Sequence, residues 1–136
     1  MSKFNFDVLK KLKKEMGGSL SEKQFYELME TIAKELGGRV YRNVIKRTPV
    51  GKVDGGTLRR GWKLSQVKPQ GKGVQIDIYN DVDYAIYVEK GHRTRNHEGW
   101  VEGKFMLEKS ENDIVKVVHL VIHDKLLRML GNKFWD

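Results

Sequence analysis

The side chains whose types and spacing could perform chemistry are mainly histidines. His119 and His123 lie four residues apart in a segment with helical periodicity, which is the spacing of two metal ligands on one helix face. The position where a zinc protease places its general base, directly after the first histidine, holds Leu120. Both histidines also point away from the apolar face of the predicted helix, so we interpret them as an exposed pair without a metal.

The other candidate sites lack essential partners. His92 and His97 lie near two glutamates, but a polar loop collects such residues by chance. Gly51-Lys52 lacks both the upstream glycine and the following Ser or Thr of a phosphate-binding loop. The sequence has no cysteine, and none of its serines lies in a nucleophile elbow. We therefore predict a protein that is not an enzyme, with no catalytic residue, no metal site and no cofactor.

Length and composition indicate an ordinary folded domain. The chain has 136 residues, of which 39% are hydrophobic and 32% charged; a disordered tail would be poorer in apolar residues. Its apolar runs are too short for a signal peptide or a membrane span. We predict one soluble domain, residues 1–136, with no membrane partner, made in a reducing compartment.

The charge is basic overall but unevenly distributed. The formal net charge is +8, from 26 Lys and Arg against 18 Asp and Glu. Residues 48–73 hold six basic and one acidic side chain, whereas residues 74–103 hold three basic and six acidic ones. Such alternation is typical of complementary patches on stacked copies of one chain, although an ordinary solvated surface explains it equally well.

The basic segment leaves a second function open. Arg59 and Arg60 stand beside Trp62 and Lys63, and cations next to an aromatic ring can bind a nucleic-acid backbone while stacking on a base. Trp62 also begins an alternating strand, which makes it a core candidate. The alternative function is thus a small basic nucleic-acid-binding module.

Helical signals dominate the first part of the chain. Residues 1–18 predict a short helix that ends at a glycine pair. Ser21 and Gln24 form a capping box at the start of a long helix, residues 21–47, which ends before Pro49. Its apolar residues recur every four positions, so the stripe drifts around a straight helix, and a kink at Gly37-Gly38 would correct that drift.

The second part alternates loops, strands and a helix. Residues 49–61 and 91–103 predict two glycine-rich or polar mobile loops that become ordered on assembly. Residues 62–90 predict an antiparallel β-meander of three to four strands, including one through Tyr84, Ile86 and Val88, and residues 104–130 a C-terminal helix. The fold class is α+β, with the meander packed against the long N-terminal helix and the C-terminal helix.

The order of three motifs resembles a known family. They are Thr48 to Gly51, Thr57 to Gly61, and the run Asn80 to His92, which contains Tyr-Ala-x-Tyr-Val-Glu-x-Gly. This order is similar to the phage tail-component family, the tail-completion or head–tail joining proteins typified by the gene-ten product of a lambdoid phage. Two details depart from the family pattern: Gly61 replaces a serine, and Lys104-Phe105 lacks an intervening proline.

The resemblance implies a non-enzymatic structural protein of a phage or prophage virion, present in the bacterial cytoplasm before assembly. It implies a ring of copies, sixfold in the particle, between the connector and the tail tube, with DNA in its lumen making only non-specific contacts. The oligomeric state of the isolated chain stays open. We expect the interface to include these residues: Lys52, Arg59, Arg60, Tyr87, Glu89, His92, Arg93, Arg95, Leu120 and Leu127.

Two roles are open for one of these residues. Glu89 could pair with Lys52, Arg59 and Arg60 of the adjacent copy, as the heterologous contact of a ring would require. It could equally cap local backbone or pair within its own chain.

Overall fold

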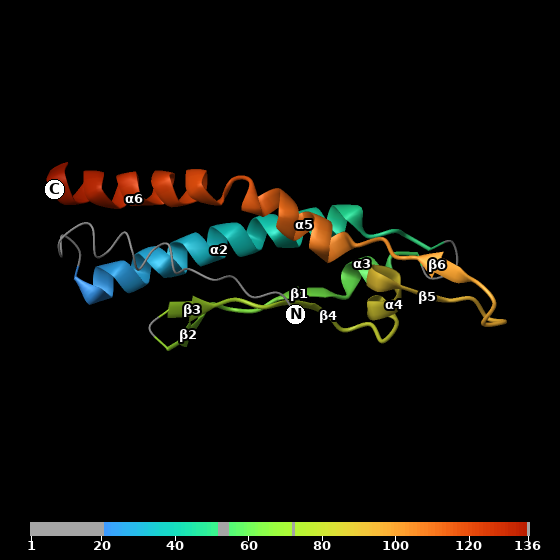
Figure 1. Ribbon diagram of the computed structural model, residues 1–136. Helices are drawn as coiled ribbons and strands as arrows, with labels where there is room; N and C mark the ends of the chain where they lie inside the picture. Colours follow the sequence, from blue (N-terminus) through green and yellow to red (C-terminus); the bar gives the residue numbers. More distant parts are fainter. Residues whose placement is uncertain (1–20, 52–54, 72, 136) are drawn as a thin grey trace.

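The structure is a computed structural model that describes residues 21–51, 55–71 and 73–135, with the backbone alone from residue 130 onward. The predicted helix over residues 1–18 and the candidate Lys52 lie outside the described residues. Three layers are stacked along one direction: the pair α5 and α6, the long helix α2, and a ribbon of strands (Figure 1).

Helix α2 spans Glu22–Arg47 and forms the central layer. Its predicted capping box is confirmed, because Gln24 N–H donates to Ser21 Oγ at 3.1 Å and Ser21 N–H donates to Gln24 Oε1 at 3.0 Å. The helix continues through Gly37-Gly38 to Arg47. A Cβ on Gly37 would lie 2.8 Å from Ile76 Cδ1, so this glycine lets the Ile76 side chain pack closely against the helix.

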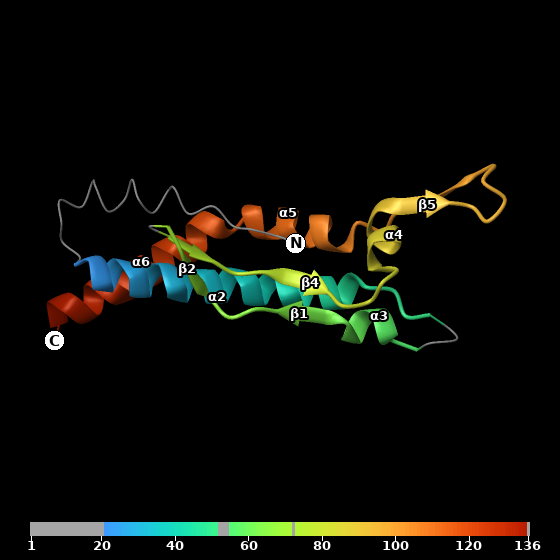
Figure 2. The ribbon, with the colours of Figure 1, turned by 90° about the horizontal axis from the view of Figure 1, so that it is seen from below.

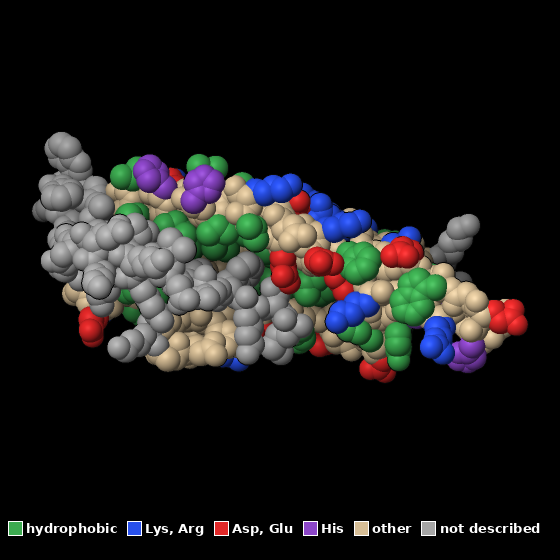
Figure 3. All heavy atoms as spheres, in the orientation of Figure 1, with side chains coloured by type: hydrophobic (Ala, Val, Ile, Leu, Met, Phe, Trp, Pro, Cys, Tyr) green, Lys and Arg blue, Asp and Glu red, His purple; other side chains and the backbone are tan. Residues whose placement is uncertain are grey.

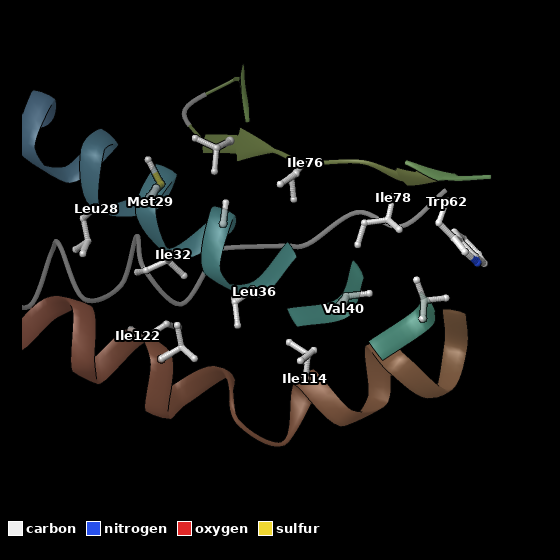
Figure 4. Close-up of a cluster of buried hydrophobic side chains, with 14 of the residues drawn as sticks. Leu28, Met29, Ile32, Leu36, Val40, Trp62, Ile76, Ile78, Ile114 and Ile122 are labelled. Atoms are coloured by element: carbon white, nitrogen blue, oxygen red, sulfur yellow. The ribbon is translucent and has the colours of Figure 1, made fainter. Parts of the chain in front are cut away.

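The core lies on both faces of α2. Figure 4 shows Ile76, between β3 and β4, and Ile78, in β4, on one side of the helix and side chains of α5 and α6, such as Ile114 and Ile122, on the other. The α2 residues at the four-residue spacing, Ile32, Leu36, Val40 and Val44, are all 0–1% exposed. A drifting apolar stripe suits a helix buried on two sides, which needs no kink to stay covered.

The strands form three antiparallel pairs. Strand β1 (Trp62–Leu64) pairs with β4 (Ile78–Asn80), and β2 (Lys68–Gln70) pairs with β3 (Gly73–Gln75). These four belong to one long hairpin that lies against α2 (Figure 2). Strands β5 (Gly91–Arg93) and β6 (Trp100–Glu102) form a separate hairpin that projects at one end. The mixed α+β class is confirmed.

The predicted third strand of the meander is wrong. Residues Ala85–Lys90 form helix α4, in which Val88 N–H donates to Tyr84 O at 3.3 Å. The alternation of Tyr84, Ile86 and Val88 suggested one buried face, yet Tyr84 and Ile86 are exposed and only Val88 packs on the core. The period-2 pattern here therefore did not mark a strand with one buried face.

Three other segment predictions also need correction. The predicted loop 49–61 contains a helical turn, α3 (Thr57–Arg60), and the predicted loop 91–103 contains the β5–β6 hairpin. The predicted helix 104–130 is two helices, α5 (Met106–Val115) and α6 (Val118–Trp135), which α2 contacts in turn. No helix within the described residues is long and apolar enough to cross a membrane.

Candidate assembly surface

A hydrogen-bonded cluster at the end of α2 fixes the first motif. The Thr48 hydroxyl donates to Val44 O at 2.6 Å and accepts from Trp62 Nε1 at 2.7 Å. Both hydrogen bonds are buried. Arg59 Nη2 donates to Thr48 O at 2.8 Å. A cation at a helix C-terminus is also favoured by the helix dipole. Arg59, a predicted interface residue, therefore ties α3 to α2 within one chain.

A second cluster joins α3 to the turn after β4. Asn80 Nδ2 donates to Leu58 O at 2.9 Å, and Asn80 Oδ1 accepts from Val82 N–H at 2.8 Å. A Cβ on Gly61 would lie 2.5 Å from Asn80 Oδ1. The glycine thus makes room for the asparagine that links two of the motifs.

The third motif is held by a carboxylate. Glu89 Oε1 accepts from Leu107 N–H at 2.9 Å, and Oε2 accepts from Glu108 N–H at 3.2 Å. These amides belong to the first turn of α5, where backbone donors have no partner within the helix and negative charge is favoured. Of the two roles considered for Glu89, the structure shows capping of backbone within its own chain.

Close backbone contacts complete this junction. Lys104 N–H donates to Val88 O at 2.8 Å and Phe105 N–H donates to Glu89 O at 3.0 Å. Gly91 has φ +91°, and a Cβ there would lie 2.6 Å from Val101 O. The Glu-x-Gly part of the motif therefore locks α4, the base of the β5–β6 hairpin and the start of α5 into one unit.

That rigid unit presents an apolar surface to solvent. Five apolar side chains at the start of α4, within it and on the β5–β6 hairpin are 40–58% exposed. We call these five residues the end surface: Tyr84, Ile86, Tyr87, Trp100 and Val101. An adjoining groove of about 510 Å³ is lined by these residues: Tyr84, Tyr87, Val88, His92 and Arg93. Figure 3 shows hydrophobic side chains at this end of the molecule, interspersed with side chains of both charges. Exposed apolar clusters of this kind mark protein contacts.

The structure brings some predicted interface residues together and separates others. Tyr87 and His92 contact edge to face, with ring centroids 6.4 Å apart, and Arg93 lines the same groove. Arg95 lies exposed near the tip of the hairpin. Arg60 is exposed on α3, where its Nη1 donates to Gly55 O at 3.0 Å.

The remaining pair lies elsewhere. Leu120 and Leu127 are exposed on α6, away from the end surface. Sequence reasoning missed Ile86, Trp100 and Val101. The signal for the last two was available, since a tryptophan and a valine within an otherwise polar loop have no core to enter.

The candidate metal ligands do not converge. His119 and His123 are exposed on α6, and within the described residues no three His, Asp or Glu side chains are close enough to hold a metal ion.

Comparison with known proteins gives one match. Neither the curated proteins nor the solved structures that were searched contain a match to this chain. Residues 8–91, more than half of the chain, match the protein family described as "Bacteriophage HK97-gp10, putative tail-component". The matched range includes Thr48, Asn80 and Glu89, the residues whose hydrogen bonds hold the three motifs. The chain belongs to this phage tail-component family.

Proposed function

We propose that this tail component completes the tail and joins it to the head by forming a ring of copies between the connector and the tail tube. The observation that carries the proposal is the end surface, in which aromatic and aliphatic side chains stay exposed on a unit held rigid by Glu89. Rigid, exposed aromatic residues are suited to permanent protein contacts, because little entropy is lost when they are covered.

The proposed partners are further copies of the chain, the connector or adaptor, and tail-tube proteins. A ring of six copies would use two different patches on each copy, since a heterologous contact closes into a ring. Exposed cations such as Arg60, Arg93 and Arg95 would meet DNA in the lumen through non-specific charge contacts only. The proposed location is the virion, after assembly in the bacterial cytoplasm.

Several features support a structural role over an enzymatic one. The polar groups that the motifs contribute, such as Thr48, Asn80 and Glu89, are engaged in backbone and side-chain contacts that hold the fold. The exposed groups beside the end surface are mixed, with cations such as Arg93 and carboxylates such as Glu102, and a tail component is a structural part of the particle. This combination suits a protein that acts through its shape.

The experiment is a deletion of the gene in a phage or prophage that encodes this chain, followed by electron microscopy of the lysate. We expect separate heads and tails, and rescue of joined particles by the wild-type gene supplied in trans. A rescue with Tyr87→Glu should fail, whereas the matched control Val50→Glu, at another exposed apolar position, should succeed. Joined particles in the deletion strain would contradict the proposal.

The nucleic-acid alternative makes a different prediction. A dedicated binding module would bind DNA with a log affinity that falls steeply as log salt rises. The ring protein should show weak binding, little affected by Tyr87→Glu. A steep salt slope together with normal particles in the deletion strain would favour the alternative.

A further inference from the structure

The two C-terminal helices are joined by a short break that allows the second of them to change chains. Lys116 and Val117 lie between α5 and α6, and both helices pack on α2. We infer that in the assembled ring α6 of each copy leaves its own α2 and packs on α2 of the next copy, in the place that the next copy's α6 has vacated. This inference rests on the proposed function and names the contact that joins neighbouring copies.

The backbone at the break is already close to helical. Lys116 has φ −67° and ψ −23°, near the α-helical values of about −63° and −42°. Val117 N–H donates to Ile114 O at 2.9 Å, and Leu120 N–H donates to Val117 O at 3.0 Å. Bonds that span three residues are those of a tighter 3₁₀ turn. A straight helix through the break therefore needs only small changes in the backbone.

The sequence at the break contains neither of the residues that usually interrupt a helix. Residues 112–120 include no Gly and no Pro. Apolar residues recur at helical spacing across the break, which is why the sequence predicts one helix over residues 104–130. The break is therefore set by packing against α2 rather than by the local sequence, and the same segment can form one straight helix when α6 is released.

Straightening carries α6 off its own α2. In Figures 1 and 2, which view the molecule from two directions, α6 turns away from the axis of α5 at the break and so stays beside α2. On the axis of α5 it would project away from α2. A continuous helix from Met106 to Trp135 would be about 45 Å long, which is enough to reach a neighbouring copy.

Helix α5 is held in place, so the exchange is confined to α6. Glu89 caps the first turn of α5, and Met106 and Ile114 are 0% and 3% exposed. Arg47 Nη1 lies 2.7 Å from Asp113 Oδ2, an ion pair that joins α5 to the end of α2. The break that follows α5 is thus the hinge.

The released α6 fits one surface in particular. Its α2-facing side is apolar, because Val121 and Ile122 are 4% and 7% exposed. The partly buried residues that pack with them are Val118, Leu126 and Met129. Such a face needs cover, and α2 of another copy offers the same surface that α6 covers within one chain. The exchange therefore repeats contacts that already fit and needs no new complementary surface.

The junction between α6 and α2 is incompletely packed. A hollow of about 200 Å³ opens between them, and its lining includes Glu35 and Arg39 of α2 and Lys125 of α6. Two ion pairs beside the hollow lie within one helix each, Glu35 with Arg39 at 2.9 Å and Asp124 with Arg128 at 3.3 Å. Releasing α6 leaves both of these pairs intact and breaks apolar contacts that the next copy restores.

Crosslinking distinguishes an exchanged α6 from one that stays on its own chain. The chain has no cysteine, so Glu35→Cys and Lys125→Cys place single thiols on α2 and α6 beside one hollow. The two variants are purified separately, mixed at about millimolar concentration, passed through mild denaturant to release α6, and returned to native buffer. A short bismaleimide should then link the two variants into a covalent dimer, which neither variant should form alone.

The matched control places the thiols on α2 and α5. Arg47→Cys and Asp113→Cys replace two side chains that form an ion pair, and α5 stays on its own chain. Both substitutions in one chain should give an internal crosslink. Mixed as separate variants, they should give at least about tenfold less covalent dimer than Glu35→Cys with Lys125→Cys.

A substitution at the break tests the straight helix. Val118→Pro puts proline at the first position of α6, where the bent chain tolerates it, whereas a straight helix would lose a hydrogen bond and collide with the preceding turn. Val118→Ala is the control, because it removes core packing without the proline ring. In sedimentation velocity at about millimolar concentration, wild type and Val118→Ala should form oligomers larger than dimers and Val118→Pro should stay monomeric. The crosslinking variants leave the break unchanged, so their result stands even if Val118→Pro fails to fold.

Four outcomes would overturn the inference. Oligomers in which Glu35→Cys and Lys125→Cys chains are not linked to each other would leave the ring proposal intact but place the contact elsewhere. Oligomers of folded Val118→Pro equal to those of wild type would show that a straight helix is not needed. Exchanged dimers and nothing larger would show a reciprocal exchange, which closes no ring. If wild type and Val118→Ala stay monomeric at about millimolar concentration, exchange between free copies is excluded, and the deletion experiment alone then decides the proposed function.

Discussion

The carboxylate of Glu89 accepts a hydrogen bond from the backbone amide of Leu107, 18 residues further along the chain, with 2.9 Å between Leu107 N and Glu89 Oε1. The same carboxylate reaches the amide of Glu108. The residue at the N-cap position of α5, Phe105, has a left-handed backbone conformation, and its side chain has no atom that could accept from the amides of the first turn. A distant acidic residue therefore supplies the cap, and in doing so it fixes the angle between α4 and α5.

Removing that cap should destabilise the fold. Glu89→Ala leaves two amides of the first turn of α5 without their acceptor, which should lower the free energy of unfolding by about 1–3 kcal/mol. Glu89→Gln keeps one acceptor oxygen but loses the favourable charge at the helix N-terminus, so its loss should be smaller. Urea denaturation measures both.

The control for this prediction is Glu102→Ala, which removes an exposed carboxylate on β6. We expect it to change the free energy of unfolding by less than about 0.5 kcal/mol. Equal losses for Glu89→Ala and Glu102→Ala would show that the cap contributes nothing specific.

Two glycines differ in how much space surrounds them, so alanine substitutions at both test the effect of close backbone contacts on stability. A Cβ on Gly103 would collide with the backbone of Glu89 and Lys90, whereas a Cβ on Gly51 would meet nothing within 4 Å. Both glycines lack the positive φ that would strain any other residue. Gly103→Ala should lower the free energy of unfolding by about 2–4 kcal/mol, because backbone atoms must move. Gly51→Ala should be neutral or slightly stabilising, and thermal unfolding of the two variants tests the difference.

Local signals were sufficient for the elements that depend on local contacts. Ser21 and Gln24 predicted the start of α2, and the apolar residues at four-residue spacing are buried as expected. The mixed α+β class followed from the same patterns. The drift of that stripe predicted a kink in α2. The drift is explained instead by the layers that cover both faces of α2, and a single segment of sequence does not reveal those layers.

Non-local contacts explain the elements that the sequence did not predict. Residues 84–88 alternate like a strand, yet they lie in and beside helix α4, whose Glu89 accepts from the amide of Leu107, 18 residues away in the sequence. The sequence predicts Trp100 and Val101 in a loop, whereas they lie in a hairpin whose two strands approach closely at Gly91 and Val101. Contacts between residues this far apart in the sequence produce no periodic pattern of apolar residues within either segment.

One ion pair gives the stability of the protein a dependence on pH. Arg39 Nε donates to Glu35 Oε1 at 2.9 Å, and this hydrogen bond, with the charge of the same guanidinium, lowers the pKa of the Glu35 carboxyl. A pKa lowered in the folded state stabilises the fold above the unfolded pKa of about 4.3 and ceases to do so as pH falls through the folded pKa.

Glu35→Gln should therefore reduce stability at pH 7 but not below about pH 3. Because the Glu35 side chain is 33% exposed, solvent screening limits the difference at neutral pH to about 0.5 kcal/mol. Urea midpoints of wild type and variant between pH 3 and pH 7 measure it. A difference that is constant across this range, or unchanged in 1 M salt, would contradict an electrostatic origin.

Removing the hydroxyl of Thr48 should lower the free energy of unfolding more than removing an exposed threonine hydroxyl. It accepts from the buried Trp62 indole and donates to Val44 O, so Thr48→Val leaves a buried N–H without its acceptor while preserving the shape of the side chain. We expect a loss of about 1–3 kcal/mol in the free energy of unfolding. Thr31→Val is the matched control, because the Thr31 hydroxyl donates to Glu27 O on the exposed side of the same helix, where water can replace the bond. If both variants lose the same free energy, the Trp62 contact is dispensable, and the anchoring of β1 to the end of α2 must depend on Arg59 instead.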